Sequence, residues 1–99
     1  MEQLVQMGKI LSDENRIKII ALINRETEVC VCEICDTLQL SQPLVSRHLK
    51  QMRQAGIVNT QQNGKWILYS LCRSPLLRCV LEEIHHIKLP KLIACAKDS

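Results

Sequence analysis

The hydrophobic positions of this chain mostly recur every three to four residues, which is the spacing of one helix face. Residues 13–24 are apolar around most of the circumference of such a helix, which predicts a central helix with Asp13 as its N-cap. A helical pattern over residues 1–10 is too short to be stable unless it packs on the rest of the chain. Residues 27–31 are predicted to be a brief extended stretch, and residues 33–39 a short helix.

The next helical pattern follows Ser41 and separates apolar from polar side chains. Ser41 is the expected N-cap, and Pro43 lies in the first turn, where a missing N–H is tolerated. At about 100° per residue, one arc collects the apolar side chains and also His48, which we interpret as a histidine at the edge of the core. The apolar arc comprises Leu44, Val45, Leu49, Met52 and Ala55. The opposite face comprises Ser46, Arg47, Lys50, Arg53 and Gln54.

A hairpin pattern comes directly after this helix. Gly56 is expected to take a left-handed conformation that ends the helix. Two strands are predicted over residues 57–62 and 65–71, joined by Asn63-Gly64, a strong hairpin signal. The fold class is therefore predicted to be mainly α with a β-hairpin wing, a winged helix-turn-helix, with Lys65 at the wing tip reaching a DNA backbone.

A last helix is predicted to begin at Ser74-Pro75 and to end at Pro90. Its apolar stripe has the spacing of a subunit interface, and no later segment is long enough to cover it. The stripe comprises Leu76, Leu77, Val80, Leu81, Ile84 and Ile87. We expect a homodimer through the first and last helices, a single domain over residues 1–99, and a short tail over residues 91–99.

Composition narrows the class of protein. Hydrophobic residues make up 46% of the 99 residues but aromatic residues only 2%, so the core must be aliphatic, which favours packed helices over a β-sandwich. The net charge of +3 requires any DNA binding to use locally clustered charge. The N-terminus lacks a signal-peptide pattern, and the longest apolar run, residues 19–23, is too short for a membrane span. We therefore expect a reducing cytoplasm, where cysteines serve as ligands or sensors.

Cys30, Cys32 and Cys35 form the strongest chemical motif. Cys32 and Cys35 share one helix face, so Cys30 joins them only if it lies in extended chain before the helix or if the first turn distorts. A helix N-terminus is expected to lower the pKa of such thiols. Three thiolates suit pyramidal As(III) or Sb(III), whereas zinc needs a fourth ligand. The alternatives are two structural cysteines with one spare, or a Cys-x-x-Cys redox pair.

The leading end of the helix after Ser41 carries the candidate DNA contacts. Gln42, Ser46 and Arg47 are predicted to meet base edges. Lys50 and Arg53 are better placed for phosphates. Without further support, this face is equally compatible with an ordinary solvated helix surface.

Residues 28–35 (EVCVCEIC), 40–49 (LSQPLVSRHL) and 64–69 (GKWILY) resemble the ArsR/SmtB family of metal-responsive repressors, and its arsenite-sensing branch most of all. The similarity extends over about residues 11–75. It implies a dimeric winged helix-turn-helix protein that represses its own operon and leaves the DNA when a metalloid binds. The resemblance implies metalloid ligands at Cys30, Cys32 and Cys35, and DNA contacts at Gln42, Ser46 and Arg47.

The remaining cysteines carry weaker signals. Cys79, Glu83 and His86 lie at i, i+4 and i+7, which allows a second metal site on the last helix or a merely solvated flank. The Asp-x-His spacing of zinc-sensing relatives is absent. Cys72 and Cys95 have no recognisable partner and are interpreted as spare thiols.

The predicted function is a transcriptional repressor that binds a palindromic operator as a dimer and dissociates when arsenite or antimonite binds. Within the same class, the inducer could be Cd(II), Pb(II), Zn(II), or an oxidant acting on Cys32 and Cys35. Two other classes are a thiol oxidoreductase using Cys32-x-x-Cys35 and a zinc-stabilised interaction module. No serine–histidine–acid or paired-carboxylate arrangement is evident, so we predict that the protein is not an enzyme.

Overall fold

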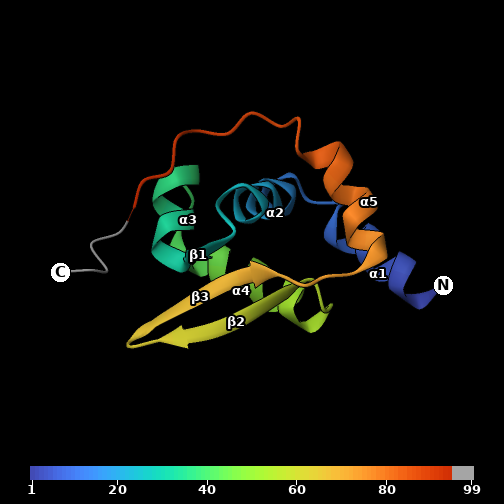
Figure 1. Cartoon of the computed structure of the whole chain (residues 1–99), viewed down its shortest axis with the longest axis horizontal. Coiled ribbons are helices and arrows are strands. Elements are labelled where there is room, and N and C mark those ends of the chain that lie inside the picture. The colour runs from blue at the N-terminus through green and yellow to red at the C-terminus, as the bar shows by residue number, and fades with distance from the viewer. Residues whose placement is uncertain (95–99) are drawn as a thin grey trace.

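The computed structural model describes residues 1–94, and its helices and strands follow the predicted order (Figure 1). The elements are α1 (Glu2–Ile10), α2 (Glu14–Glu26), β1 (Glu28–Cys30), α3 (Val31–Leu38), α4 (Gln42–Gln54), β2 (Val58–Asn63), β3 (Trp66–Leu71) and α5 (Pro75–Ile84). Helices α3 and α4 form the helix-turn-helix, and β2 and β3 form the wing. The prediction of a mainly α winged helix-turn-helix is confirmed. None of the helices in residues 1–94 is long and apolar enough to cross a membrane.

Helix α2 forms the centre of the hydrophobic core. Ile19, Ile20, Leu22 and Ile23 are fully buried, as their continuous apolar run predicted. The Asp13 carboxylate caps the helix by accepting a hydrogen bond from the Asn15 N–H at 2.8 Å. The helix ends at Glu26, two residues later than predicted from Asn24, because the weak helix propensity of an asparagine is readily overridden by tertiary packing.

The sheet contains one more strand than the predicted hairpin. Its order is β1-β3-β2, with both pairs antiparallel, so the extended stretch before α3 pairs with the wing. Cys30 lies opposite Leu68 in this pairing. The turn is also displaced by one residue from the prediction. Asn63 pairs with Trp66, which leaves Gly64 and Lys65 as the two loop residues, with Gly64 at φ +63°.

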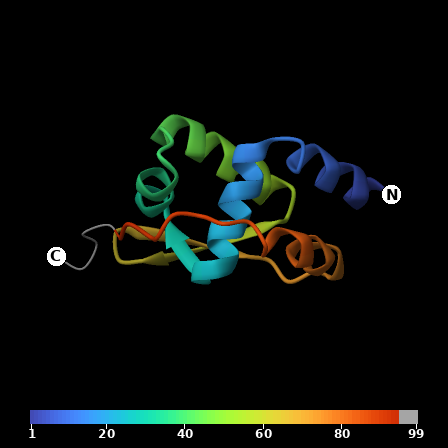
Figure 2. The same ribbon diagram turned by 90° about the horizontal axis from the view of Figure 1, so that it is seen from above.

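Helix α5 ends at Ile84, well before the Pro90 stop that its apolar stripe predicted. Residues 85–94, here called the C-terminal strap, instead cross over α2 and reach α3 (Figures 1 and 2). Leu89 and Leu92 pack against the core, and this burial favours an extended strap over further turns of helix.

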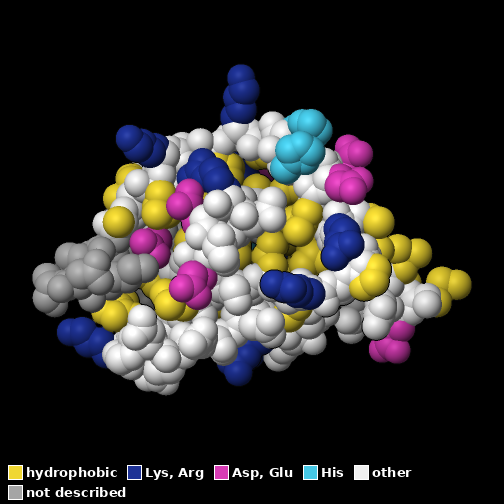
Figure 3. Space-filling view, viewed as in Figure 1, with side chains coloured by type: hydrophobic (Ala, Val, Ile, Leu, Met, Phe, Trp, Pro, Cys, Tyr) yellow, Lys and Arg dark blue, Asp and Glu magenta, His cyan; other side chains and the backbone are white. Residues whose placement is uncertain are grey.

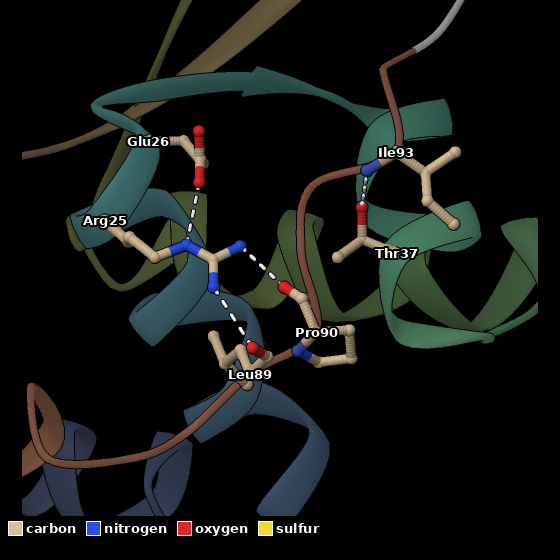
Figure 4. Close-up of polar contacts among 6 residues, drawn as sticks. All are labelled: Arg25, Glu26, Thr37, Leu89, Pro90 and Ile93. Atoms are coloured by element: carbon tan, nitrogen blue, oxygen red, sulfur yellow. Dashed lines mark hydrogen bonds and ion pairs between the residues drawn. The ribbon is translucent and has the colours of Figure 1, made fainter.

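Polar contacts hold the C-terminal strap on the neighbouring helices (Figure 4). The Arg25 guanidinium donates to the Leu89 carbonyl at 3.3 Å and to the Pro90 carbonyl at 2.8 Å. The Ile93 N–H donates to Thr37 Oγ1 on α3 at 2.9 Å. The expected tail is therefore docked on α3 as far as Ile93, and its last five residues lie outside the described part of the chain.

Candidate metal centre and nucleic-acid interface

The first two cysteines of the motif meet where β1 becomes α3. Cys30 is the N-cap of α3 and has an extended backbone, with φ −97° and ψ 167°. Its Sγ lies 3.9 Å from the Sγ of Cys32. Of the two arrangements that the spacing allowed, the structure has the first, in which Cys30 precedes the helix.

All three cysteines line one cavity of about 530 Å³ between α3, the start of α4 and the wing. Its wall consists of Cys30, Val31, Cys32, Cys35, Asp36, Leu40, Gln42, Lys65, Trp66 and Ile67. We call it the cysteine cavity. Two of these wall residues, Gln42 and Lys65, are also predicted DNA contacts. The cavity therefore adjoins both elements that a winged helix-turn-helix protein uses to touch DNA.

The three sulfurs are not arranged as a finished ion site. Among residues 1–94, no group of three or more histidine, cysteine, aspartate or glutamate side chains is placed to hold a metal ion. Cys32 takes part in a disulfide, so an ion can use its sulfur only after reduction. Binding an ion through all three sulfurs thus requires movement of the segment around the start of α3.

The electrostatic surroundings of Cys35 differ from the prediction. Burial raises the pKa of the Cys35 thiol, and the neighbouring Asp36 carboxylate raises this pKa further. The expectation of a lowered pKa is wrong here because Cys35 lies beyond the first turn of α3, where the helix dipole is strongest. Ion binding through Cys35 must therefore remove a proton that this thiol holds firmly at neutral pH.

Glu33 is a site residue that the sequence analysis missed. Its side chain is only 3% exposed, and its carboxylate accepts a hydrogen bond from the Cys30 N–H at 3.0 Å. This is one half of a capping box, and the Cys-x-x-Glu spacing was the available signal, with cysteine at the place usually held by serine or threonine. Through this bond, a displacement of Cys30 is passed directly to the first turn of α3.

Helix α4 presents the predicted polar face to solvent. Every predicted contact on it is exposed: Gln42, Ser46, Arg47, Lys50 and Arg53. Val45, Leu49 and Met52 are buried behind them, and His48 is 3% exposed, which confirms its interpretation as a core histidine. Ser41 is the N-cap as predicted, but its side chain makes no capping hydrogen bond.

The wing tip adds a cation to this surface, since Lys65 is exposed in the turn between β2 and β3. On the face drawn in Figure 3, Lys and Arg side chains lie apart from one another and form no single basic patch. The small net charge of +3 agrees with this scattered arrangement.

The structure does not assemble the second candidate metal site. Cys79 and Glu83 are exposed on α5, but His86 lies beyond the end of that helix, so the expected i+7 spacing is lost. Neither this group nor any other set of three such side chains among the described residues is placed to hold a metal ion. Cys72 donates a hydrogen bond to Asn59 Oδ1 at 3.1 Å, and burial raises its pKa. Cys95 lies outside the described residues.

This chain is similar to known transcriptional regulators. The family model described as "Bacterial regulatory protein, arsR family" matches residues 13–60. Over 63 residues the chain is 49% identical to the arsenic resistance transcriptional regulator ArsR1 of Pseudomonas putida, covering 64% of this chain and 49% of that protein. Over 67 residues it is 43% identical to the arsenical resistance operon repressor of Escherichia coli, covering 68% and 57%.

The name of a third relative refers to a different element, cadmium. The cadmium resistance transcriptional regulatory protein CadC of Listeria innocua is 41% identical over 61 residues, covering 62% of this chain and 51% of that protein. The chain thus spans about half the length of these relatives. Among solved structures, HlyU from Vibrio cholerae superimposes with a TM-score of 0.76 at 29% identity, covering 86% of this chain and 90% of that one.

Proposed function

We propose that this protein is a repressor whose inducer is As(III) or Sb(III), bound by Cys30, Cys32 and Cys35. The chain belongs to the arsR family of bacterial regulatory proteins, whose members are transcriptional regulators and not enzymes. The observation that carries this proposal is the cysteine cavity, whose wall includes the three sulfurs together with Gln42 and Lys65. An all-sulfur set of three ligands suits a soft, pyramidal ion. The names of two relatives, which refer to arsenic resistance, support the same inducer.

The coupling between the ion and the DNA runs through short connections in the protein. Drawing three thiolates together moves Cys30, whose N–H is held by the buried Glu33 carboxylate. The start of α3 then shifts, and α4 follows because α3 and α4 pack against each other. Gln42, the first residue of α4, lies in the wall of the same cavity and is displaced with it. The exposed face of α4 then no longer fits the DNA groove that it contacts.

The repressor acts as a homodimer through α1 and α5. Leu4 is 61% exposed and Val5 48% exposed on α1, at the end of the molecule where hydrophobic side chains gather in Figure 3. Leu76, Val80 and Leu81 of α5 are only half-buried within one chain. Uncovered apolar surface on both helices favours association with a second copy. Two α4 helices related by a two-fold axis would then read the half-sites of a palindromic operator.

The test is a titration of arsenite into a protein–DNA complex followed by fluorescence anisotropy. The DNA is a labelled duplex selected by the protein from a random library, and the reductant is a phosphine because thiol reductants compete for arsenite. Wild-type protein is expected to release the duplex, whereas the Cys32→Ser, Cys35→Ser double variant should stay bound. Cys79→Ser, an exposed cysteine on α5, is the matched control and should respond like wild type. Retention of DNA by arsenite-loaded wild type contradicts the proposal.

A second inducer, Cd(II), has its own supporting observation. Asp36 lies in the wall of the cysteine cavity together with the three cysteines, and its carboxylate is an oxygen ligand. A tetrahedral divalent ion needs such a fourth ligand, and the CadC relative is named for cadmium resistance. Asp36→Asn separates the two candidates, because it should weaken release by Cd(II) but should not weaken release by arsenite.

A further inference from the structure

Arg16 on α2 bonds to two other helices at once. Its guanidinium donates from Nε to the Ile10 carbonyl at 2.8 Å and from Nη2 to the Lys9 carbonyl at 2.9 Å. Both carbonyls belong to the last turn of α1. On the other side, Nη1 donates to Gln51 Oε1 on α4 at 2.6 Å and lies 3.5 Å from Nδ1 of the buried His48. One side chain thus connects α1, α2 and α4.

The chemistry of these contacts makes them directional. Carbonyls in the last turn of a helix lack the N–H partner four residues on, so they can accept from side chains. The Ile10 carbonyl accepts from Arg16, and the Lys9 carbonyl accepts from both Arg16 and Ser12 Oγ, the latter at 2.6 Å. A guanidinium presents five N–H donors in one rigid plane, which fixes the relative directions of the groups that it holds. The bond to the Ile10 carbonyl and the contact with His48 are part-buried, so water competes less for them than for the other two bonds of Arg16, which are exposed.

Direct packing between α1 and α4 is incomplete beside this bridge. A cavity of about 320 Å³ lies there, lined by Lys9 and Ile10 from α1, by Gln51 and Gln54 from α4, and by Arg16 itself. Side chains therefore do not fill the space between these parts of the two helices. If side chains filled this space, their packing would fix the angle between α1 and α4. Because they do not, the angle depends more strongly on the hydrogen bonds of Arg16.

We propose that Arg16 is a positioning residue that sets the angle between α1 and α4, and through it the separation of the half-sites that a dimer prefers. This inference rests on the proposed dimer through α1 and α5, which makes α1 the fixed point from which each α4 extends. With the bridge intact, the two α4 helices have one defined separation. Without it, each α4 can tilt about α2, and operators of neighbouring spacing become acceptable.

The experiment measures spacing preference, which a merely stabilising residue would not change. Wild-type protein is titrated against duplexes whose two half-sites are about 10 base pairs apart, and against duplexes with one or two base pairs inserted or removed. Arg16→Met should reduce the ratio of affinities for the preferred and shifted spacings by about fivefold, the lower end of typical coupling between sites. Affinity for a duplex with a single half-site should stay within about twofold of wild type.

Two further variants keep the test decisive. Gln51→Met removes only the α4 end of the bridge at an exposed position, so it should fold and should relax the spacing preference in the same direction. Arg25→Met is the matched control, because Arg25 also lies on α2 and also donates to two main-chain carbonyls, but on the C-terminal strap (Figure 4). It should keep the wild-type ratio.

The possible failures are distinguishable. Unchanged spacing ratios in Arg16→Met and Gln51→Met, or an equal loss in Arg25→Met, overturn the role of Arg16 and leave the repressor proposal standing. Wild-type protein with no spacing preference overturns both the dimer and this role. Failure of arsenite to release DNA bears only on the inducer, since the spacing measurement uses no arsenite.

Discussion

The phosphate contacts of α4 and the wing predict a specific salt dependence. Lys50, Arg53 and Lys65 are the exposed cations assigned to the DNA backbone, which gives six in a dimer. Each neutralised phosphate contributes about −0.9 to the slope of log K against log salt, so the expected slope is about −5.4. Lys50→Gln removes one contact from each subunit, and the slope should weaken to about −3.6. Between about 50 and 200 mM salt, wild type should lose about a thousandfold in affinity.

The assay is fluorescence anisotropy with one labelled duplex at a series of salt concentrations. Lys88→Gln is the matched control, since Lys88 is also exposed but lies on the C-terminal strap. The strap crosses the top of Figure 1, whereas α4 and the wing lie at the bottom. Its slope should equal that of wild type. The assignment is refuted if Lys50→Gln keeps the wild-type slope, or if Lys88→Gln weakens it as much.

Two predictions concern stability. Burial lowers the pKa of His48 below its usual 6.5, so the unfolded chain takes up a proton before the folded chain does. The free energy of unfolding should therefore fall as pH drops from about 7.5 to about 5.5. Urea unfolding of His48→Gln should show a smaller fall over the same pH range. An equal fall in that variant would contradict the role of His48 in this pH dependence. Thr37→Val removes the acceptor of the Ile93 N–H and should lower the free energy of unfolding, measured with urea, by about 1 kcal/mol. An unchanged urea midpoint would mean that this contact of the C-terminal strap adds nothing to stability.

Local patterns predicted the parts of the fold that local physics determines. The two faces of α4 followed from its 3.6-residue period, with Val45 buried and Arg47 exposed as expected. The Asp13 cap and the left-handed Gly56, at φ +75°, followed from residue chemistry. The extended position of Cys30 was one of two arrangements that the spacing of the cysteines allowed.

The features that the sequence did not predict depend on contacts between distant segments. Strand β1 is too short to be identified without its pairing to β3. The early end of α5 accompanies the packing of Leu89 and Leu92 against a core built mostly from residues far earlier in the chain. The approach of Lys65 and Trp66 to the cysteines, which creates the cysteine cavity, likewise needs the folded wing. The ligand role of the three cysteines still rests on their chemistry and on the family.

The central claim, that the cysteine cavity and the DNA face are energetically linked, is tested most directly by measuring arsenite affinity with and without DNA. Trp66 is the single tryptophan of the chain and lines the cavity, so its fluorescence reports binding at that site. We predict that saturating DNA weakens arsenite binding by the same factor by which arsenite weakens DNA binding, as linkage requires. Equal arsenite affinity in the free and DNA-bound protein would contradict the claim.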